Sequence, residues 1–380
     1  MTTAAPPRSM LDHLLNLVAV KLELTVTQYE DAIQKYRAVD DWLSAPGSIL
    51  YPYAPQLYPQ GSLRILTTVK PRGHEEYDLD IVSQLAVNPR QVTWQQVYRW
   101  EKQRLREHGY YKTILELKNR CLRLNYAGQF HMDILPACPD PVLGGTAILV
   151  PDHKAGGWKS SDPKGYATSF EARSNWRLAE KAAQPVPPQV APEFKAPLVR
   201  AVQLIKRQRD QVFTDADLAP ASIVQTTLAA EAYAGQATTA EAVTRYLYYV
   251  SQLLDANPKM PFRVLNPVNK GEVLSERWES TPGAYEAFRR ELYAFKDLWE
   301  RLLRAQGTVE IHELLKQLFG EIVATDAVRE YSARMGAAKE AGQFGTRPGS
   351  SSLYYGLGAG AAPGVVRVPR NTNYGISGSV

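Results

Sequence analysis

Cysteine is scarce in this 380-residue sequence, which contains only Cys121 and Cys138. Two cysteines cannot make a disulfide framework, and this pair lacks metal-ligand spacing, so we expect buried thiols in a reducing, cytoplasmic setting. Long apolar runs are also missing, since no window reaches about 18 consecutive apolar residues, and no membrane span is predicted. The opening MTTAAPPRSM lacks the basic-then-apolar order of a secretion signal.

Charge of one sign is also in small excess, with a formal net charge of +5. Residues 336–380 contain four basic residues and one acidic residue, so the rest of the chain is close to neutral. Such a weak field argues against an extended surface for duplex nucleic acid and leaves open a local basic groove. The apolar share of 44% is that of a globular protein with real cores.

The most informative stretch contains Asp78 and Asp80, in the segment YDLDIV at 77–82. Side chains alternate along a strand, so the two carboxylates share one face, about 7 Å apart, while Leu79 and Ile81 point into a core. Two carboxylates on one face repel each other unless a cation lies between them. This pattern favours a divalent metal site, with a solvated strand face as the alternative.

Gly61 and Ser62 precede this strand and predict a turn in which backbone N–H groups and a hydroxyl meet a phosphate. We expect the apolar run 63–69 to form a strand, followed by a charged loop in which His74 is solvated. Together, the turn and the carboxylate pair predict a metal-dependent nucleotidyl transferase, in which two Mg²⁺ ions about 3.5–4 Å apart hold the reacting oxygens. Mn²⁺ is an alternative ion.

A third carboxylate, Asp133, lies on a predicted strand at 129–136 with His131 on the same face. It joins the first two only if the two strands are neighbours; a solvated or capping role is the alternative. We interpret His131 as a packed or supporting side chain. In the second half of the chain, Lys206 near the basic end of an amphipathic helix and Ser222 at the start of the next are candidate phosphate contacts, with a solvated helix end as the alternative.

The pattern predicts an α+β protein whose first part contains a sheet and whose second part is helical. Thr27 and Glu30 fit a capping box at the start of a helix. Residues 151–175 read as a loop, and the prolines of 185–197 as a stiff connector. The predicted helices are 10–24, 27–43, 92–108, 168–183, 198–213, 221–234, 239–256, 282–306 and 309–319, and the further strands are 114–118 and 121–126. The predicted domains are 1–184, the connector 185–197, a helical domain 198–335 and a disordered tail 336–380.

Several segments together resemble the bacterial cGAS/DncV-like nucleotidyltransferases (CD-NTases) of CBASS anti-phage systems, within the oligoadenylate-synthase-like superfamily. The resemblance covers roughly residues 20–320. The matching segments are QGS at 60–62, TTVKP at 67–71, EYDLDIV at 76–82, HMDILPA at 131–137, WKSSDPKGYA at 158–167, PLVRAVQLIKRQRD at 197–210, ASIVQTTLAAEAY at 221–233 and LNPVNKGEVLSERW at 265–278. One departure is Leu66, where many relatives have glycine.

This resemblance implies a polymerase-β-like core of mixed sheet and helices, a helical C-terminal domain and a long N-terminal brace helix. It implies Gly61 and Ser62 on the triphosphate, two Mg²⁺ ions on Asp78, Asp80 and Asp133, and Lys206 and Ser222 on donor phosphates. It also implies a cyclic di- or trinucleotide made from ATP or other nucleoside triphosphates, and a separate effector that the product activates. A HORMA-type or conjugating protein would engage the C-terminal tail.

Two other functions fit the same residues. One is a linear oligonucleotide or adenylyl transferase that acts on RNA or protein, which would leave a phosphatase-sensitive product or a labelled macromolecule. The other is a non-catalytic nucleotide sensor or scaffold, against which the presence of all three carboxylates argues.

Overall fold

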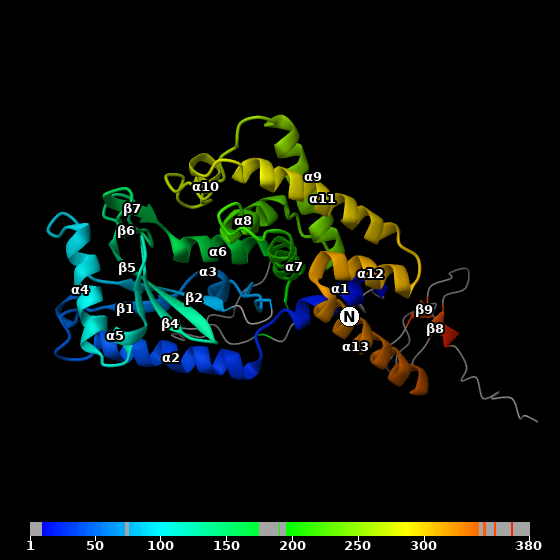
Figure 1. Cartoon of the computed structure of the whole chain (residues 1–380), viewed down its shortest axis with the longest axis horizontal. Helices are drawn as coiled ribbons and strands as arrows, with labels where there is room; N and C mark the ends of the chain where they lie inside the picture. Colours follow the sequence, from blue (N-terminus) through cyan, green and yellow to red (C-terminus); the bar gives the residue numbers. More distant parts are fainter. Residues whose placement is uncertain are drawn as a thin grey trace, which may run out of the picture. The chain divides into compact units, whose positions relative to one another are not determined.

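The computed structural model describes residues 10–72, 76–174, 190 and 195–341, together with the dipeptides 345–346, 353–354 and 366–367. The chain divides into two compact units. The larger unit is Leu22–Arg301, and the smaller one combines Met1–Lys21 with Leu302–Val380. Both units contain helices, and the large sheet belongs to the larger unit (Figure 1).

A mixed sheet forms the centre of the larger unit. Its strands are β1 (Gln56–Pro59), β2 (Tyr77–Gln84), β3 (Leu115–Leu117), β4 (Leu122–Tyr126), β5 (Phe130–Pro139), β6 (Ile148–Asp152) and β7 (Gly157–Ser161). The strand order is β1-β2-β5-β4-β3, and β6 pairs with both β5 and β7. Only β2 and β5 run parallel among these pairs, and their register sets Asp80 opposite Asp133. The predicted strands at 77–82, 114–118, 121–126 and 129–136 are therefore confirmed.

Ten helices from α2 to α11 belong to the described part of this unit or begin in it (Figure 1). They are α2 (Val26–Ser44), α3 (Gly61–Arg64), α4 (Trp94–Glu107), α5 (Tyr111–Ile114), α6 (Pro163–Ser174), α7 (Pro197–Val212), α8 (Ser222–Ala232), α9 (Thr239–Ala256), α10 (Glu276–Ser280) and α11 (Ala284–Arg304), with a 3₁₀ turn at Tyr51–Tyr53. The helical character predicted for the second half is confirmed, although α10 was not predicted.

One face of the sheet packs against α2 and α4. Tyr36 of α2, Val97 of α4, and Leu79 and Ile81 of β2 are buried in a single core. Trp42 of α2 donates its indole N–H to a backbone carbonyl of α4 at 2.9 Å, which ties the two helices together. This packing consumes the apolar face of β2, so its other face, with Asp78 and Asp80, remains available for a site.

The segment after Gly61 differs from the predicted strand at 63–69. Gly61–Arg64 forms a single helical turn, α3, and no strand follows it before β2 in the residues described there. Leu66 adopts a left-handed backbone with φ of 61°, which breaks any extended run. A short apolar run has no periodicity that separates a strand from a buried turn, and this ambiguity explains the wrong prediction. The left-handed φ also explains why glycine suits this position.

The capping box of α2 lies two residues earlier than predicted. Thr25 is the N-cap: its hydroxyl accepts from the backbone N–H of Gln28 at 3.2 Å, and the Gln28 amide oxygen accepts from the N–H of Thr25 at 3.0 Å. The prediction of Thr27 and Glu30 is wrong, because the sequence holds two overlapping Thr-x-x-Gln/Glu patterns and the helix starts at the first.

Residues 151–174 form a hairpin and a helix rather than the predicted loop, which was placed at 151–175. The hairpin of β6 and β7 ends at Ser161, and α6 begins at Pro163, five residues before the predicted helix start at 168. Pro163 fits the first turn of a helix, where its missing N–H is not needed. Residues 175–183 of the predicted helix and most of the connector 185–197 lie outside the described residues, so the domain boundaries stay predictions.

The smaller unit contains α1 (Met10–Lys21), α12 (Thr308–Phe319) and α13 (Glu321–Glu340), with α13 against both of the others. Lys21 of α1 pairs with Glu330 of α13 at 2.5 Å. The disordered tail predicted from 336 is corrected, because α13 continues to Glu340 through residues of high helix propensity such as Ala337 and Ala338.

Beyond α13, the described dipeptides β8 (Gly345–Thr346), β9 (Leu353–Tyr354) and β10 (Val366–Arg367) pair as a small antiparallel sheet in the order β10-β8-β9. This pairing also departs from the predicted tail. Within the described part of the chain, no helix is both long enough and apolar enough to cross a membrane.

Candidate active site

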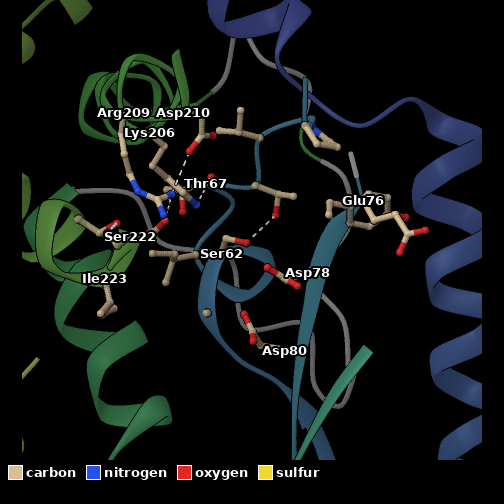
Figure 2. Close-up of a pocket in the computed structure, with 17 residues that line it drawn as sticks. Ser62, Thr67, Glu76, Asp78, Asp80, Lys206, Arg209, Asp210, Ser222 and Ile223 are labelled. Carbon is tan, nitrogen blue, oxygen red and sulfur yellow. Dashed lines mark hydrogen bonds and ion pairs between the residues drawn. The ribbon is translucent and has the colours of Figure 1, made fainter. Parts of the chain in front are cut away.

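A cavity of about 380 Å³ lies in the larger unit, between the β2–α3 region and helices α7 and α8. It is lined by Gly61, Ser62, Ile65, Thr67, Thr68, Val69, Pro71, Glu76, Tyr77, Asp78, Asp80, Lys206, Arg209, Asp210, Ser222, Ile223 and Thr226. Figure 2 shows Asp78 and Asp80 at one side, Lys206 and Arg209 at the other, and Ser62 between them. Six of the seven predicted site residues therefore border one cavity.

The seventh predicted residue, Asp133, is on β5, the strand next to β2. Because these strands are parallel and in register, Asp80 is directly opposite Asp133, and Asp78 is opposite His131. The sequence left open whether the strands of Asp80 and Asp133 are neighbours, and the structure shows that they are. Asp133 does not line the cavity itself.

Arg123 on β4 holds Asp133 and was not predicted. Its Nε donates to Asp133 Oδ1 and its Nη2 to Asp133 Oδ2, both at 2.7 Å, and Nη2 also reaches Asp78 Oδ1 at 3.2 Å. The hairpin between β4 and β5 turns at Ala127–Gln129, so counting outward from that turn pairs Arg123 with Asp133. Hairpin register is therefore a signal that would have identified this arginine.

Gly61 comes so close to Asp80 that a side chain has no room. Its φ is 57°, and a Cβ built on it would lie 2.6 Å from Asp80 Oδ2. The N–H of Gln60 also donates to the carbonyl of Asp80 at 2.9 Å, which fixes α3 against β2. Glycine is thus needed here for both its backbone conformation and its lack of a side chain.

Ser62 lies at the base of the cavity, inside α3. Its hydroxyl accepts from Thr68 Oγ1 at 3.3 Å, and its carbonyl accepts from the N–H of Thr67 at 2.9 Å. These bonds fold residues 62–68 into a compact loop that lines one side of the cavity. The hydroxyl keeps its own proton available as a hydrogen-bond donor to a ligand oxygen.

The opposite side is formed by α7 and the start of α8. Lys206 donates to the carbonyl of Thr67 at 3.0 Å, and burial lowers the pKa of Lys206 to about 8. Arg209 donates to Asp210 at 2.9 Å and to the hydroxyl of Ser222 at 3.0 Å. Arg209 and Asp210 were not predicted, although their three- and four-residue spacing from Lys206 puts all three on one helix face.

On the carboxylate side, the three carboxylates of Asp78, Asp80 and Asp133 outnumber the single cation Arg123. Burial, together with the carboxylates of Asp78 and Asp133, raises the pKa of Asp80 to about 7. Asp78 is open to the cavity, with 56% of its side chain exposed. Two oxygen donors on one strand face, one of them desolvated and under repulsion, fit a hard divalent cation.

In this geometry the third carboxylate is engaged elsewhere, because both of its oxygens accept from Arg123. Accordingly, the described residues contain no group of three or more His, Cys, Asp or Glu side chains arranged to hold a metal ion. Asp78 and Asp80 are the pair that fits a metal directly. Asp133 stays a candidate third ligand, because each of its oxygens keeps a lone pair beside its hydrogen bond from Arg123.

His131 has a structural partner. Its Nδ1 lies 2.9 Å from Glu76 Oε2, and the other oxygen of Glu76 accepts from the N–H of Gly128. This network ties the start of β2 to the hairpin of β4 and β5, which agrees with the supporting role predicted for His131. His74 lies outside the described residues.

A second cavity, of about 430 Å³, adjoins the first, and the residues that line both are Gly61, Ile65, Asp80 and Ile223. Arg120 and Lys159 line it, and both form ion pairs with Glu276 of α10, that of Arg120 at 3.1 Å. Asp80 is therefore accessible from two connected spaces. The site has room for two ligands near one carboxylate.

The mixed sheet, the paired strand carboxylates and the cations facing them are the arrangement that the sequence predicted for a nucleotidyltransferase site. Residues 55–136 match the family described as "Cyclic GMP-AMP synthase DncV-like, nucleotidyltransferase domain". Over 330 residues the chain is 33% identical to the c-di-GMP synthase of Roseivirga ehrenbergii, which spans 84% of this chain and 87% of that protein. The chain belongs to the DncV-like nucleotidyltransferase family, and it is an enzyme of that class.

Other relatives extend the likeness to the helical half. The cyclic dinucleotide synthase CdnG of Bradyrhizobium diazoefficiens is 27% identical over 394 residues, 94% of this chain and 90% of that protein. The structure of CdnG in complex with GTP has a TM-score of 0.72 at 23% identity, over 86% of this chain and all 100% of that one. The CdnC:HORMA-deltaN complex of E. coli MS115-1 has a TM-score of 0.59 at 12% identity, over 81% of this chain and 96% of that one. The predicted fold class is confirmed.

Proposed function

We propose that this protein joins two GTP molecules into a cyclic dinucleotide, which serves as a second messenger in anti-phage defence. The supporting observation is the single cavity that brings Asp78 and Asp80 together with Lys206. The names of the relatives, c-di-GMP synthase and cyclic dinucleotide synthase, favour a ring of two nucleotides, and the GTP in the CdnG complex favours guanine. ATP, implied by the sequence resemblance, is the alternative substrate.

In the proposed reaction, a 2′- or 3′-hydroxyl of one nucleotide attacks the α-phosphorus of the other. A P–O bond forms, the bond to pyrophosphate breaks, and the hydroxyl proton passes to solvent. Lys206, Arg209 and Ser222 hold the donor triphosphate from α7 and α8, while Gly61 and Ser62 approach it from α3. In the second step, a hydroxyl of the other nucleotide attacks the remaining α-phosphorus, a second pyrophosphate leaves, and the ring closes. Most of the catalysis is positioning and charge neutralisation.

The residues that would hold metal are Asp78 and Asp80, joined by Asp133. Two Mg²⁺ ions, or Mn²⁺ in their place, would neutralise phosphate charge and favour the ionised hydroxyl there. Arg123 keeps Asp133 and Asp78 charge-compensated in the free protein. The same arginine, once released, lies within reach of phosphate oxygens entering beside β4.

The test is incubation of the purified protein with α-³²P-labelled GTP, ATP or both in the presence of Mg²⁺, followed by phosphatase and mass spectrometry. A phosphatase-resistant dinucleotide from GTP alone is the expected product. A variant with both Asp78→Asn and Asp80→Asn, prepared in parallel, measures contaminating activity.

The other outcomes identify the rival functions. A linear product that phosphatase degrades, or label attached to RNA or protein, would show that the enzyme transfers the nucleotide to another acceptor and does not form a ring. If no product forms with any nucleotide mixture, even in the presence of candidate activating proteins, the remaining function is that of a non-catalytic sensor or scaffold.

We further propose that the tail after α13 is the binding segment for a HORMA-type or conjugating partner and that the product acts on a separate effector in the cytoplasm. A HORMA complex exists for CdnC, a protein of similar fold. Removal of residues 342–380 should abolish co-purification of such a partner while leaving the basal synthesis unchanged. Retained co-purification would place the contact elsewhere.

A further inference from the structure

A third cavity, of about 540 Å³, lies over α4, away from the candidate active site. Its walls come from α4, the turn between β3 and β4, and the turn between β6 and β7; α4 and β6 are in contact (Figure 1). The lining residues are Gln95, Tyr98, Arg99, Lys102, Leu117, Lys118, Asn119, His153 and Lys154. None of them borders either cavity of the candidate active site. The space is therefore separate from the machinery described above.

The lining of this cavity is basic. It includes Arg99, Lys102, Lys118 and Lys154, and it includes no carboxylate. Among the described residues, only Lys118 of these four has an ion pair, with Glu116 at 2.6 Å. Four cations around one hollow, in a chain whose formal net charge is only +5, are a local concentration of positive charge. Mutual repulsion among them falls when an anion binds.

The two turns that complete the cavity are held in place by hydrogen bonds. The Asn119 side chain donates to Asp152 at 3.0 Å and accepts from the N–H of Lys154 at 2.8 Å, so it bridges the turns. Tyr98 donates its hydroxyl to the carbonyls of Lys118 at 3.0 Å and Cys121 at 3.2 Å. The backbone positions of Lys118 and Lys154 are thus fixed relative to α4. A preformed site loses little entropy on binding.

The cavity also offers surfaces for a ring. His153 is exposed, and its ring packs in T-shaped geometry against Trp94 and Tyr98 at centroid distances of 4.9 and 4.3 Å. Leu117 adds an apolar side chain that is 45% exposed. The His153 ring is held in place by its neighbours, and an exposed leucine and four cations lie beside it. Such a lining suits a molecule with one flat or apolar part and one anionic part. The cavity volume is that of a small-molecule site.

We propose that this cavity binds a phosphorylated small molecule of nucleotide size. Its phosphate groups lie against Arg99, Lys102 and Lys154, and its ring lies against His153 and Leu117. Phosphate is the anion of choice because the donors come from α4 and from the turn between β6 and β7 and can contact several oxygens at once. This site does not depend on the proposed reaction, since it shares no residue with it.

The test is lysine acylation of the intact protein followed by mass spectrometry, which reports each lysine separately. The probes are inorganic tripolyphosphate and GTP, and Lys259, an exposed lysine in the helical half, is the internal reference. We expect both probes to lower the acylation rates of Lys102 and Lys154 by about threefold or more, because charge-assisted hydrogen bonds hold the amines against phosphate. GTP should act at the lower concentration if the ring contributes. Equal potency of the two probes would overturn the part of the proposal that concerns the ring.

Two variants separate binding here from binding in the candidate active site. Arg99→Glu should remove the protection of Lys102 and Lys154, whereas Arg106→Glu, an exposed arginine on the same helix outside the cavity, should leave it intact. Protection that survives Arg99→Glu, or rates that never change up to millimolar probe, would overturn the proposal. Circular dichroism of both variants verifies that α4 remains folded.

Discussion

The two faces of the central sheet each meet a carboxyl group with a raised pKa, in opposite surroundings. On the cavity face, burial and two neighbouring carboxylates raise the pKa of Asp80 to about 7. Against the core face, burial raises the pKa of Glu101, on α4, to about 8. Only Asp80 lines a cavity together with cations such as Lys206. A raised pKa therefore does not identify a catalytic group unless a cavity and an opposing charge accompany it.

The core-face carboxyl group has no use that the structure reveals. Glu101 is fully buried, Ser83 of β2 is the one polar side chain that acts on its pKa against burial, and no basic side chain among the described residues forms an ion pair with it. A neutral carboxyl group is the form that such an apolar site tolerates. On the cavity face, by contrast, a cation can enter and stabilise the ionised form.

The largest effect is expected on the cavity face. Asp80→Asn removes the more buried of the two oxygen donors on β2 while keeping its shape, and we expect cyclic dinucleotide synthesis to fall by about 10³-fold or more. Asp41→Asn, an exposed carboxylate of α2, is the matched control and should retain full activity. Product is quantified by mass spectrometry under equal protein concentration. A fall of less than tenfold in Asp80→Asn would break the contrast between the two faces.

The sequence predicted the strand face of the site better than the rest, for a physical reason. Alternation along β2 depends on adjacent residues only, so Asp78 and Asp80 could be assigned to one face without knowledge of the sheet. Their proximity to Asp133 needed the parallel pairing of β2 with β5, which is a long-range contact. Prediction of Arg123 as the partner of Asp133 requires the register of the β4–β5 hairpin, which follows from the position of its turn.

The loop at 61–69 was mispredicted because its conformation comes from tertiary contacts. Gly61 and Leu66 both have positive φ, and only the glycine signals this in the sequence. The buried leucine is held in its left-handed conformation by the surrounding structure, at a cost of about 1–2 kcal/mol. Glu101 was equally invisible, since a charged residue on an amphipathic helix normally points to solvent.

The second-largest effect concerns the core face and depends on pH. The carboxyl group of Glu101 titrates near 4.5 when exposed and near 8 in the folded protein, so the folded state binds more protons between these values. The contribution of Glu101 to the free energy of unfolding is therefore fully present below pH 4.5. It is lost progressively as the pH rises towards about 8. Glu101→Gln cannot ionise, and at pH about 8 it should be more stable than the wild type by roughly 4 kcal/mol.

Urea unfolding at both ends of this pH range measures the difference. The exposed Glu286→Gln is the control and should follow the wild type at every pH. Synthesis by Glu101→Gln should stay near the wild-type rate. If Glu101→Gln lost activity as Asp80→Asn does, the distinction between the faces would be wrong.

The third effect tests the close approach between α3 and β2. Gly61→Ala puts a Cβ 2.6 Å from Asp80 Oδ2, and we expect kcat/KM to fall about 30-fold because the carboxylate must move. Gly47→Ala also has a positive φ, of 86°, but its Cβ would meet nothing within 4 Å. Both variants should lose about 1 kcal/mol of stability from backbone strain, and only Gly61→Ala should lose activity. Equal activities would show that the contact with Asp80 is not needed.

The smallest effect concerns the cation opposite the carboxylates. Lys206→Met keeps the length of the side chain and removes its charge, and we expect the KM for GTP to rise about tenfold with kcat little changed, because a phosphate contact outside the bonds that form and break stabilises ground and transition states alike. The exposed Lys259→Met is the control. A fall in kcat at constant KM would mean that Lys206 stabilises the charge that develops on the leaving pyrophosphate in the transition state. Unchanged kinetics would mean that the carboxylates of the cavity face work without this opposing cation, so that the cavity, rather than the charge across it, distinguishes Asp80 from Glu101.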